Sequence, residues 1–95
     1  MLFTLLQSPW QCDIDSLLLL LQEGDDLLLL QDGVTAALAG SQMLVKLNAT
    51  PAMLWVLEED VVARGLVERI STKVARLDYT GFVALTAKHQ QQVAW

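Results

Sequence analysis

The sequence has few of the residues from which metal sites and many enzyme active sites are built. Among its 95 residues it contains one cysteine, Cys12, and one histidine, His89. A lone cysteine cannot form a disulfide within the chain, and Cys12 has no partner at the spacing of a metal site. We therefore expect a reducing compartment, the cytoplasm, and no bound metal or cofactor.

Positive charge is missing from the first half of the chain. The first basic residue is Lys46, it is preceded by six acids, and the net charge is -5. Nucleic-acid binding depends on clustered lysine and arginine, so no direct contact with nucleic acid is expected. No basic stretch precedes the apolar N-terminal residues, which argues against a signal peptide.

Long apolar runs are absent as well. The two longest runs, Leu17–Leu21 and Leu27–Leu30, are far shorter than the ~20 residues that a membrane-spanning helix needs. We therefore expect no association with a membrane.

What the sequence has in excess is apolar surface. Hydrophobic residues make up 54% of the chain, and three of them are tryptophans. A single domain covering residues 1–95 buries only about 60–65% of the surface of its unfolded chain. Some apolar surface is therefore expected to remain outside, where it would contact another protein. The alternative is a leucine-rich monomer.

Short apolar segments alternate with helical segments and are separated by turn residues. This alternation predicts an α/β fold, a small three-layer domain with a mainly parallel sheet of about four strands. The expected strands are Met1–Leu6, Leu27–Leu30, Ala52–Leu57 and Val74–Leu77. The expected helical segments begin near Asp13 or Ser16, at Thr35, at Gln42, at Glu58 and, after the cap Asp78, at Tyr79.

The five leucines of Leu17–Leu21 form an unusual helix. At 100° per residue they surround the helix axis and cannot form one stripe that faces the core. We expect this helix to be buried on more than one side, either within the domain or against a neighbouring protein.

The loops that would carry a ligand in such a fold offer little chemistry. Doubly wound domains bind ligands at the C-terminal ends of their strands. The first such loop, Gln7–Trp10, has no glycine to bring the backbone close to a phosphate. In the second loop Asp32 has no evident base or metal partner, so it is expected to form a turn or an interface. A small-ligand site at that loop is the alternative.

Two further residues could suggest catalysis. Cys12 lies near a helix start, which favours a thiolate, but the neighbouring Asp13 and Asp15 raise its pKa. We interpret Cys12 as a small apolar side chain, and a sulfur-carrying role as the alternative. His89 follows Lys88 near the end of the last helix and is expected on the surface.

The tryptophans suggest how the chain contacts other proteins. Trp55, in the middle of a strand, is expected in the core. Trp10 and Trp95 lie in a loop and at the chain end, where they serve either as interface anchors or in simple packing. The candidate subunit interface comprises Trp10, Asp32, Gly33, Val34 and Trp95.

Taken in order, several motifs resemble the DsrH family of small sulfur-relay subunits, whose fold is DsrE/DsrH-like. The longest motif is Gly24–Ala37, GDDLLLLQDGVTAA, and the set spans almost the whole chain. The others are Thr4-Leu5, Ser8–Trp10, Glu59-Asp60, Ala63–Leu66, Asp78–Thr80, Phe82-Val83, Leu85-Thr86, Lys88-His89 and Ala94-Trp95.

The resemblance implies a non-catalytic subunit that assembles with TusC and TusD into a heterohexamer, a dimer of heterotrimers. Such a complex takes persulfide sulfur from TusA and passes it to TusE, toward 2-thiolation of the wobble uridine in tRNA. The resemblance places the acceptor cysteine in TusD. Relatives from sulfur-oxidising bacteria have a cysteine in the first helix, but Ser16–Leu20 has none. This difference favours the tRNA-thiolation branch, and the alternative is direct persulfide transfer by Cys12.

Overall fold

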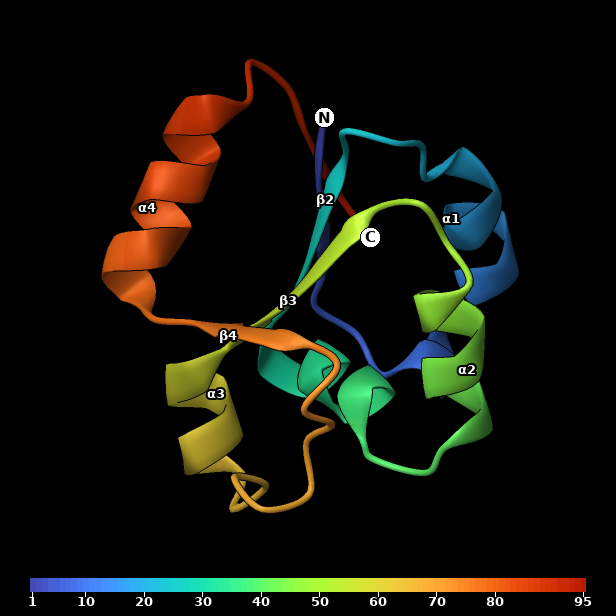
Figure 1. The fold of residues 1–95 in the computed structure, drawn as a ribbon, viewed down its shortest axis with the longest axis vertical. Helices are drawn as coiled ribbons and strands as arrows, with labels where there is room; N and C mark the ends of the chain where they lie inside the picture. Colours follow the sequence, from blue (N-terminus) through green and yellow to red (C-terminus); the bar gives the residue numbers. More distant parts are fainter.

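Five parallel strands form the centre of the computed structural model, which describes residues 1–95 (Figure 1). Their spatial order is β4-β3-β2-β1-β5. The strands are β1 (Leu2–Leu5), β2 (Asp26–Leu29), β3 (Met53–Leu57), β4 (Ala75–Leu77) and β5 (Gln92–Ala94). The predicted α/β class and parallel sheet are confirmed, and all four expected strands are present.

The fifth strand was not predicted. β5 pairs with β1 in parallel, and Val93 lies opposite Phe3. The backbone N–H of Trp95 donates to the carbonyl of Thr4 at 2.7 Å. A three-residue edge segment with polar neighbours has no detectable periodicity, so only pairing with a distant strand defines it.

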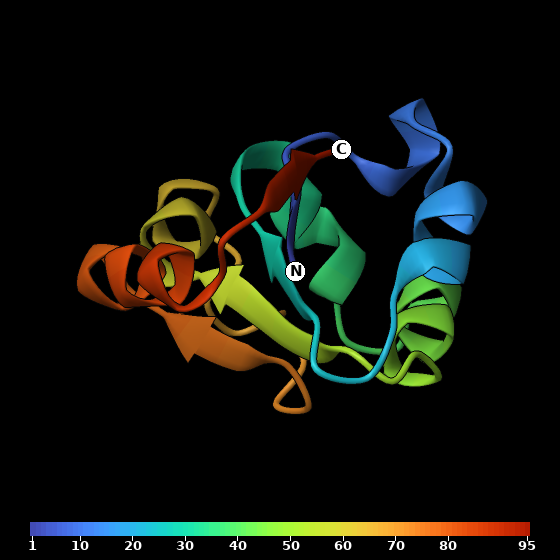
Figure 2. The ribbon, with the colours of Figure 1, turned by 90° about the horizontal axis from the view of Figure 1, so that it is seen from above.

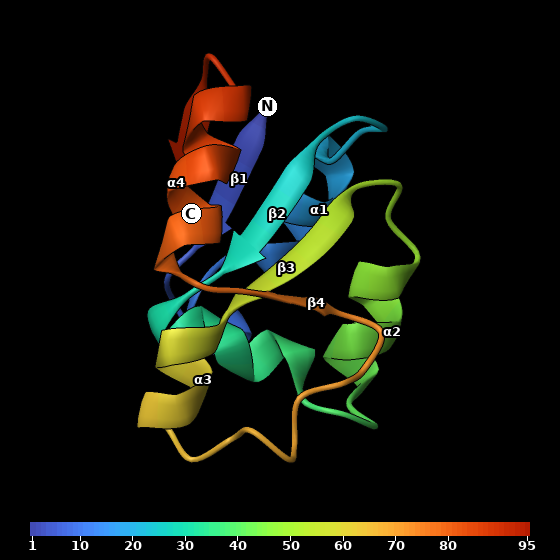
Figure 3. The same ribbon diagram turned by 60° about the vertical axis from the view of Figure 1, so that its left-hand side comes forward.

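Helices cover both faces of the sheet and produce the expected three layers. Figures 1 and 2 show α1 and α2 on one side of the sheet and α4 on the other. Figure 3 shows α3 close to the ends at which β2 and β3 terminate. The helical elements are η1 (Pro9–Gln11), α1 (Ile14–Leu20), η2 (Gln31–Ala37), α2 (Gln42–Asn48), α3 (Glu58–Ala63) and α4 (Tyr79–Lys88). None of these helices has the length and apolar character needed to cross a membrane.

The helices begin where polar side chains can cap them. Carboxylates of Asp13 and Asp78 accept from the backbone N–H groups of Ser16 and Gly81, and the Ser41 hydroxyl accepts from Leu44. Each cap satisfies a donor that the first helical turn leaves free. Asp78 was the predicted cap of the last helix, and Asp13 was one of the two residues near which the first helix was expected to begin.

The central strand β2 divides the core into two clusters. Leu27 and Leu29 point into the larger cluster, under α1, η2 and α2. Leu28 and Leu30 point the other way and join Leu85 of α4 in a smaller cluster. Since all four leucines are at most 9% exposed, the expectation of a strand covered on both faces is confirmed.

The leucine-rich helix α1 is covered on one side only. Ile14 and Leu17 are buried, and Leu18 packs partly against the core. Leu19 is 87% exposed and Leu20 is 49% exposed. The fold of the chain therefore buries one side of the helix and leaves the other side without a cover.

At Gly33 the backbone of η2 comes very close to the backbone of β1. A Cβ atom at Gly33 would overlap the backbone carbonyl of Leu5. We expect Gly33→Ala to lower the free energy of unfolding by about 3 kcal/mol. Gly40→Ala is the control, because Gly40 has φ of +79° and open space around it, so the same change there costs about 1 kcal/mol. Equal losses in urea unfolding would show that the close approach is unimportant.

Candidate functional site

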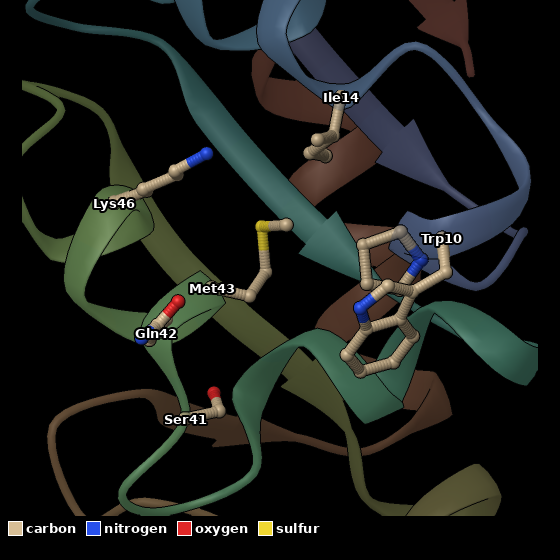
Figure 4. Close-up of a pocket in the computed structure, with 7 residues that line it drawn as sticks. Trp10, Ile14, Ser41, Gln42, Met43 and Lys46 are labelled. Atoms are coloured by element: carbon tan, nitrogen blue, oxygen red, sulfur yellow. The ribbon is translucent and has the colours of Figure 1, made fainter.

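A hollow of about 500 Å³ lies where the chain leaves β1, between η1 and α2. Pro9 at the start of η1 and a hydrogen bond from the Trp10 N–H to the Ser8 hydroxyl set the path of this turn. The turn leaves the Trp10 side chain 66% exposed. Figure 4 shows Trp10 on one side of the hollow and Met43 and Lys46 of α2 on the other.

The lining of the hollow combines apolar and polar side chains. An indole, the Met43 thioether and the Ile14 side chain provide most of its apolar surface. The Ser41 hydroxyl already accepts a hydrogen bond from the Leu44 N–H. The ammonium of Lys46 lies 3.5 Å from the Asp15 carboxylate. The apolar side chains of Trp10, Ile14 and Met43 give the hollow a surface that an apolar side chain of another molecule can contact.

The tryptophans of the predicted interface have different surroundings. Trp10 is exposed and lines the hollow. Trp95 is half-buried against the main core, and its indole N–H donates to the carbonyl of Asp13 at 3.0 Å. Trp95 thus packs within the chain, whereas most of the Trp10 side chain is exposed beside the hollow.

The three consecutive interface candidates of η2 also differ in their exposure to solvent. Asp32 is exposed, and its carboxylate lies 3.1 Å from the Arg64 guanidinium. Gly33 is buried against Leu5, and Val34 is completely buried in the main core. In this fold the side chain of Val34 cannot reach another protein, so the accessible candidates are Trp10, Asp32 and the exposed part of Trp95.

Cys12 sits between η1 and α1, half-buried and packed partly against the core. Burial raises the pKa of its thiol, and the charge of Asp13 raises it further. Both effects disfavour the thiolate, which is the nucleophilic form. The structure contains no group of three or more histidine, cysteine or acidic side chains arranged to hold a metal ion.

A charged cluster that the sequence did not reveal lies at the opposite edge of the sheet. The carboxylate of Asp26, the first residue of β2, is 2% exposed. It accepts hydrogen bonds from the Trp55 indole N–H at 2.9 Å and the Lys88 ammonium at 3.1 Å. Nε2 of His89 lies 2.6 Å from the same carboxylate. The expectation that His89 is a surface residue is therefore wrong, since its side chain is only 8% exposed.

This cluster joins the end of α4 to two strands. Burial by itself raises the pKa of Asp26, but hydrogen bonds from Trp55, His89 and Lys88 together outweigh it, so the pKa lies below its ordinary value. Trp55, expected in the core, is half-buried, and its indole N–H donates a hydrogen bond to this carboxylate. The one sequence signal for this cluster is an acidic residue at the first position of a buried strand. Its partners lie 29 to 63 residues away along the chain, so sequence spacing could not identify them.

The Asp26 cluster predicts a pH-dependent stability. A carboxylate with a lowered pKa stabilises the fold fully above the unfolded-state pKa of about 4 and loses this contribution as the pH falls through its lower folded-state pKa. We expect Asp26→Asn to lower the free energy of unfolding at pH 7 by about 2 kcal/mol, because it removes the buried anion that Trp55, Lys88 and His89 contact.

Urea unfolding from pH 7 down to pH 3 measures both effects. The variant should lose less stability on acidification than the original chain does. The control is Asp15→Asn, because Asp15 is exposed and its contact with Lys46 is long. Identical pH profiles for the original chain and Asp26→Asn would contradict the assignment.

Comparison with known proteins gives matches along the whole chain. The family model described as DsrH like protein matches residues 7–92. Proteins named TusB from Escherichia coli O81 (strain ED1a) and Shigella dysenteriae serotype 1 (strain Sd197) are 55% and 54% identical, over 100% of this chain and of each relative. The solution NMR structure of protein Tm0979 from Thermotoga maritima superposes with a TM-score of 0.67. It is 25% identical, and the alignment covers 96% of this chain and 97% of that one.

Proposed function

This chain belongs to the DsrH family, and on that premise we propose that it is a non-catalytic subunit of a sulfur-relay complex. The observation that carries the proposal is the 55% identity with proteins named TusB over the full length of both chains. The complex would pass persulfide sulfur toward 2-thiolation of the wobble uridine in tRNA, in the cytoplasm. Its other subunits would be TusC and TusD, in a heterohexamer that receives sulfur from TusA and delivers it to TusE.

The surface of the chain supports a role in assembly. Trp10 is exposed beside a hollow that Ile14 and Met43 also line, and tryptophan is enriched among the residues that dominate interface energies. We propose that Trp10 contacts a partner subunit, together with Asp32 and the exposed part of Trp95. Gly33 and Val34 would act indirectly, because their packing holds η2 and therefore Asp32 in place.

The environment of Cys12 supports a non-catalytic role. In persulfide transfer, an acceptor thiolate attacks the outer sulfur of the donor persulfide. A new S–S bond forms on the acceptor, and the donor leaves as a thiolate. Burial and the charge of Asp13 raise the pKa of Cys12, so the attacking form is scarce at neutral pH.

The alternative function makes Cys12 itself a persulfide carrier. Its thiolate would attack the donor persulfide and hold the outer sulfur until the next acceptor takes it. The one observation in its favour is that the side chain is only half-buried and sits at the surface between η1 and α1.

Replacement of Cys12 separates the two functions. We expect Cys12→Ser to leave sulfur transfer from TusA to TusE unchanged in the reconstituted complex, measured with labelled sulfur. Mass spectrometry under non-reducing conditions should find no persulfide on the original chain. Loss of transfer, with assembly intact, would instead establish Cys12 as the carrier.

Replacement of Trp10 tests assembly. Since truncation of an interface tryptophan commonly costs 2 kcal/mol or more, we expect Trp10→Ala to weaken binding to TusC and TusD by about thirtyfold. Tyr79→Ala is the control, because Tyr79 is a comparably exposed aromatic residue, at 57%, on α4. Isothermal titration calorimetry measures both variants, and equal effects would argue against the Trp10 hollow as an interface.

A further inference from the structure

The outer face of α1 presents apolar side chains that the fold does not bury. Leu19 is 87% exposed and Leu20 is 49% exposed. Both leucines lie near the C-terminal end of α1, the opposite end from Ile14, which lines the Trp10 hollow. Figures 1 and 2 show α1 at the outside of the molecule, near α2.

A groove of about 370 Å³ continues this apolar face toward the edge of the sheet. Leu20 forms one wall, and Met1, Phe3 and Val93 supply the other apolar lining. Met1 is 40% exposed and Val93 is half-buried. Exposed leucines beside a groove form a surface against which the side chains of another protein can pack closely.

Acidic side chains surround this surface. Asp15 is one helical turn before Leu19 on the same face of α1, and Glu23 and Asp25 follow the helix. Asp15 is 3.5 Å from the exposed Lys46, and Asp25 is 2.9 Å from the N-terminal ammonium. Glu23 forms no ion pair, and Asp13 accepts hydrogen bonds only from Ser16. The rim is therefore negative overall.

The negative rim selects the kind of partner. In a symmetric dimer of this chain the same patch would face itself, and acids would lie opposite acids. Such like-charge contacts oppose association, whereas a partner with lysine or arginine around its apolar centre would be attracted. The charge pattern therefore favours a different protein over a second copy.

We propose that the outer face of α1, formed by Leu19, Leu20 and the adjoining groove, is the docking surface for a partner subunit that presents apolar side chains ringed by lysine or arginine. The inference rests on the proposed function, because it assumes a complex of unlike subunits. It adds a second contact at the other end of α1 from the Trp10 hollow. A subunit with two different neighbours requires two such surfaces.

The test compares matched variants in the complex with TusC and TusD. Leu19→Ser should weaken binding of the chain by about tenfold or more, as expected for an apolar residue at an interface centre. Val83→Ser is the control, since Val83 is 65% exposed on α4, across the sheet from α1, and it should leave binding unchanged. The thermal unfolding midpoint of both variants should remain close to that of the original chain, because both side chains are exposed.

A second variant tests the charge of the partner. Glu23→Lys should slow association and weaken the salt dependence of the association rate, because it removes attraction to basic groups. A faster association of this variant would mean that the partner surface is acidic, which would overturn the proposal.

The remaining outcomes distinguish failure of the α1 docking surface from failure of the proposed function. If the original chain binds and Leu19→Ser binds equally well, the α1 surface is wrong and the proposed function stands. If the original chain binds neither subunit, the proposed function fails and the docking surface fails with it. If the original chain forms a dimer that Leu19→Ser dissociates, the occupant is a second copy, and the choice of an unlike partner is overturned.

Discussion

The structure depends on one strand that is buried on both faces. β2 supplies Leu27 and Leu29 to one core cluster and Leu28 to the other. A strand in this position must have neighbours on both sides and helices above and below, so the three layers follow from it. Because the strands are parallel, β1, β2 and β3 all end at one edge of the sheet, and η1, η2 and α3 follow them there. The Trp10 hollow lies at this edge.

The opposite edge shows what the arrangement costs. Asp26 begins the same buried strand, so its carboxylate is removed from water. The chain compensates with three donors, from Trp55 on β3 and from Lys88 and His89 at the end of α4. A buried ion of this kind adds little net stability to the fold, but the removal of one of its partners lowers the stability strongly. The cluster thereby fixes where α4 ends and where the chain turns toward β5.

The apolar excess of the sequence divides between the core and the surface, where exposed hydrophobic residues lie on several elements. A chain this small cannot bury all of its leucine and tryptophan. Trp10 at one end of α1, and Leu19 and Leu20 at the other, remain exposed. Both regions fit a protein whose neighbours complete its burial, and neither offers a nucleophile or an acid–base pair. Under the proposed function, such a subunit would shape the assembly while another chain carries the persulfide.

The sequence by itself determined the class of fold, the parallel sheet and the cap Asp78, because periodicity and capping act over a few residues. For the first helix it left Asp13 as one of several cap candidates, and the structure selects Asp13. It also predicted that α1 is buried on more than one side, either within the domain or against a neighbouring protein, and in the structure the chain itself covers one side. Only the tertiary structure decided that Val34 is core and not interface, that β5 completes the sheet, and that His89 is buried against Asp26. Each of these depends on contacts between segments that are distant in the chain. Local spacing carries no information on such contacts, because the free energy that fixes them comes from packing across the sheet.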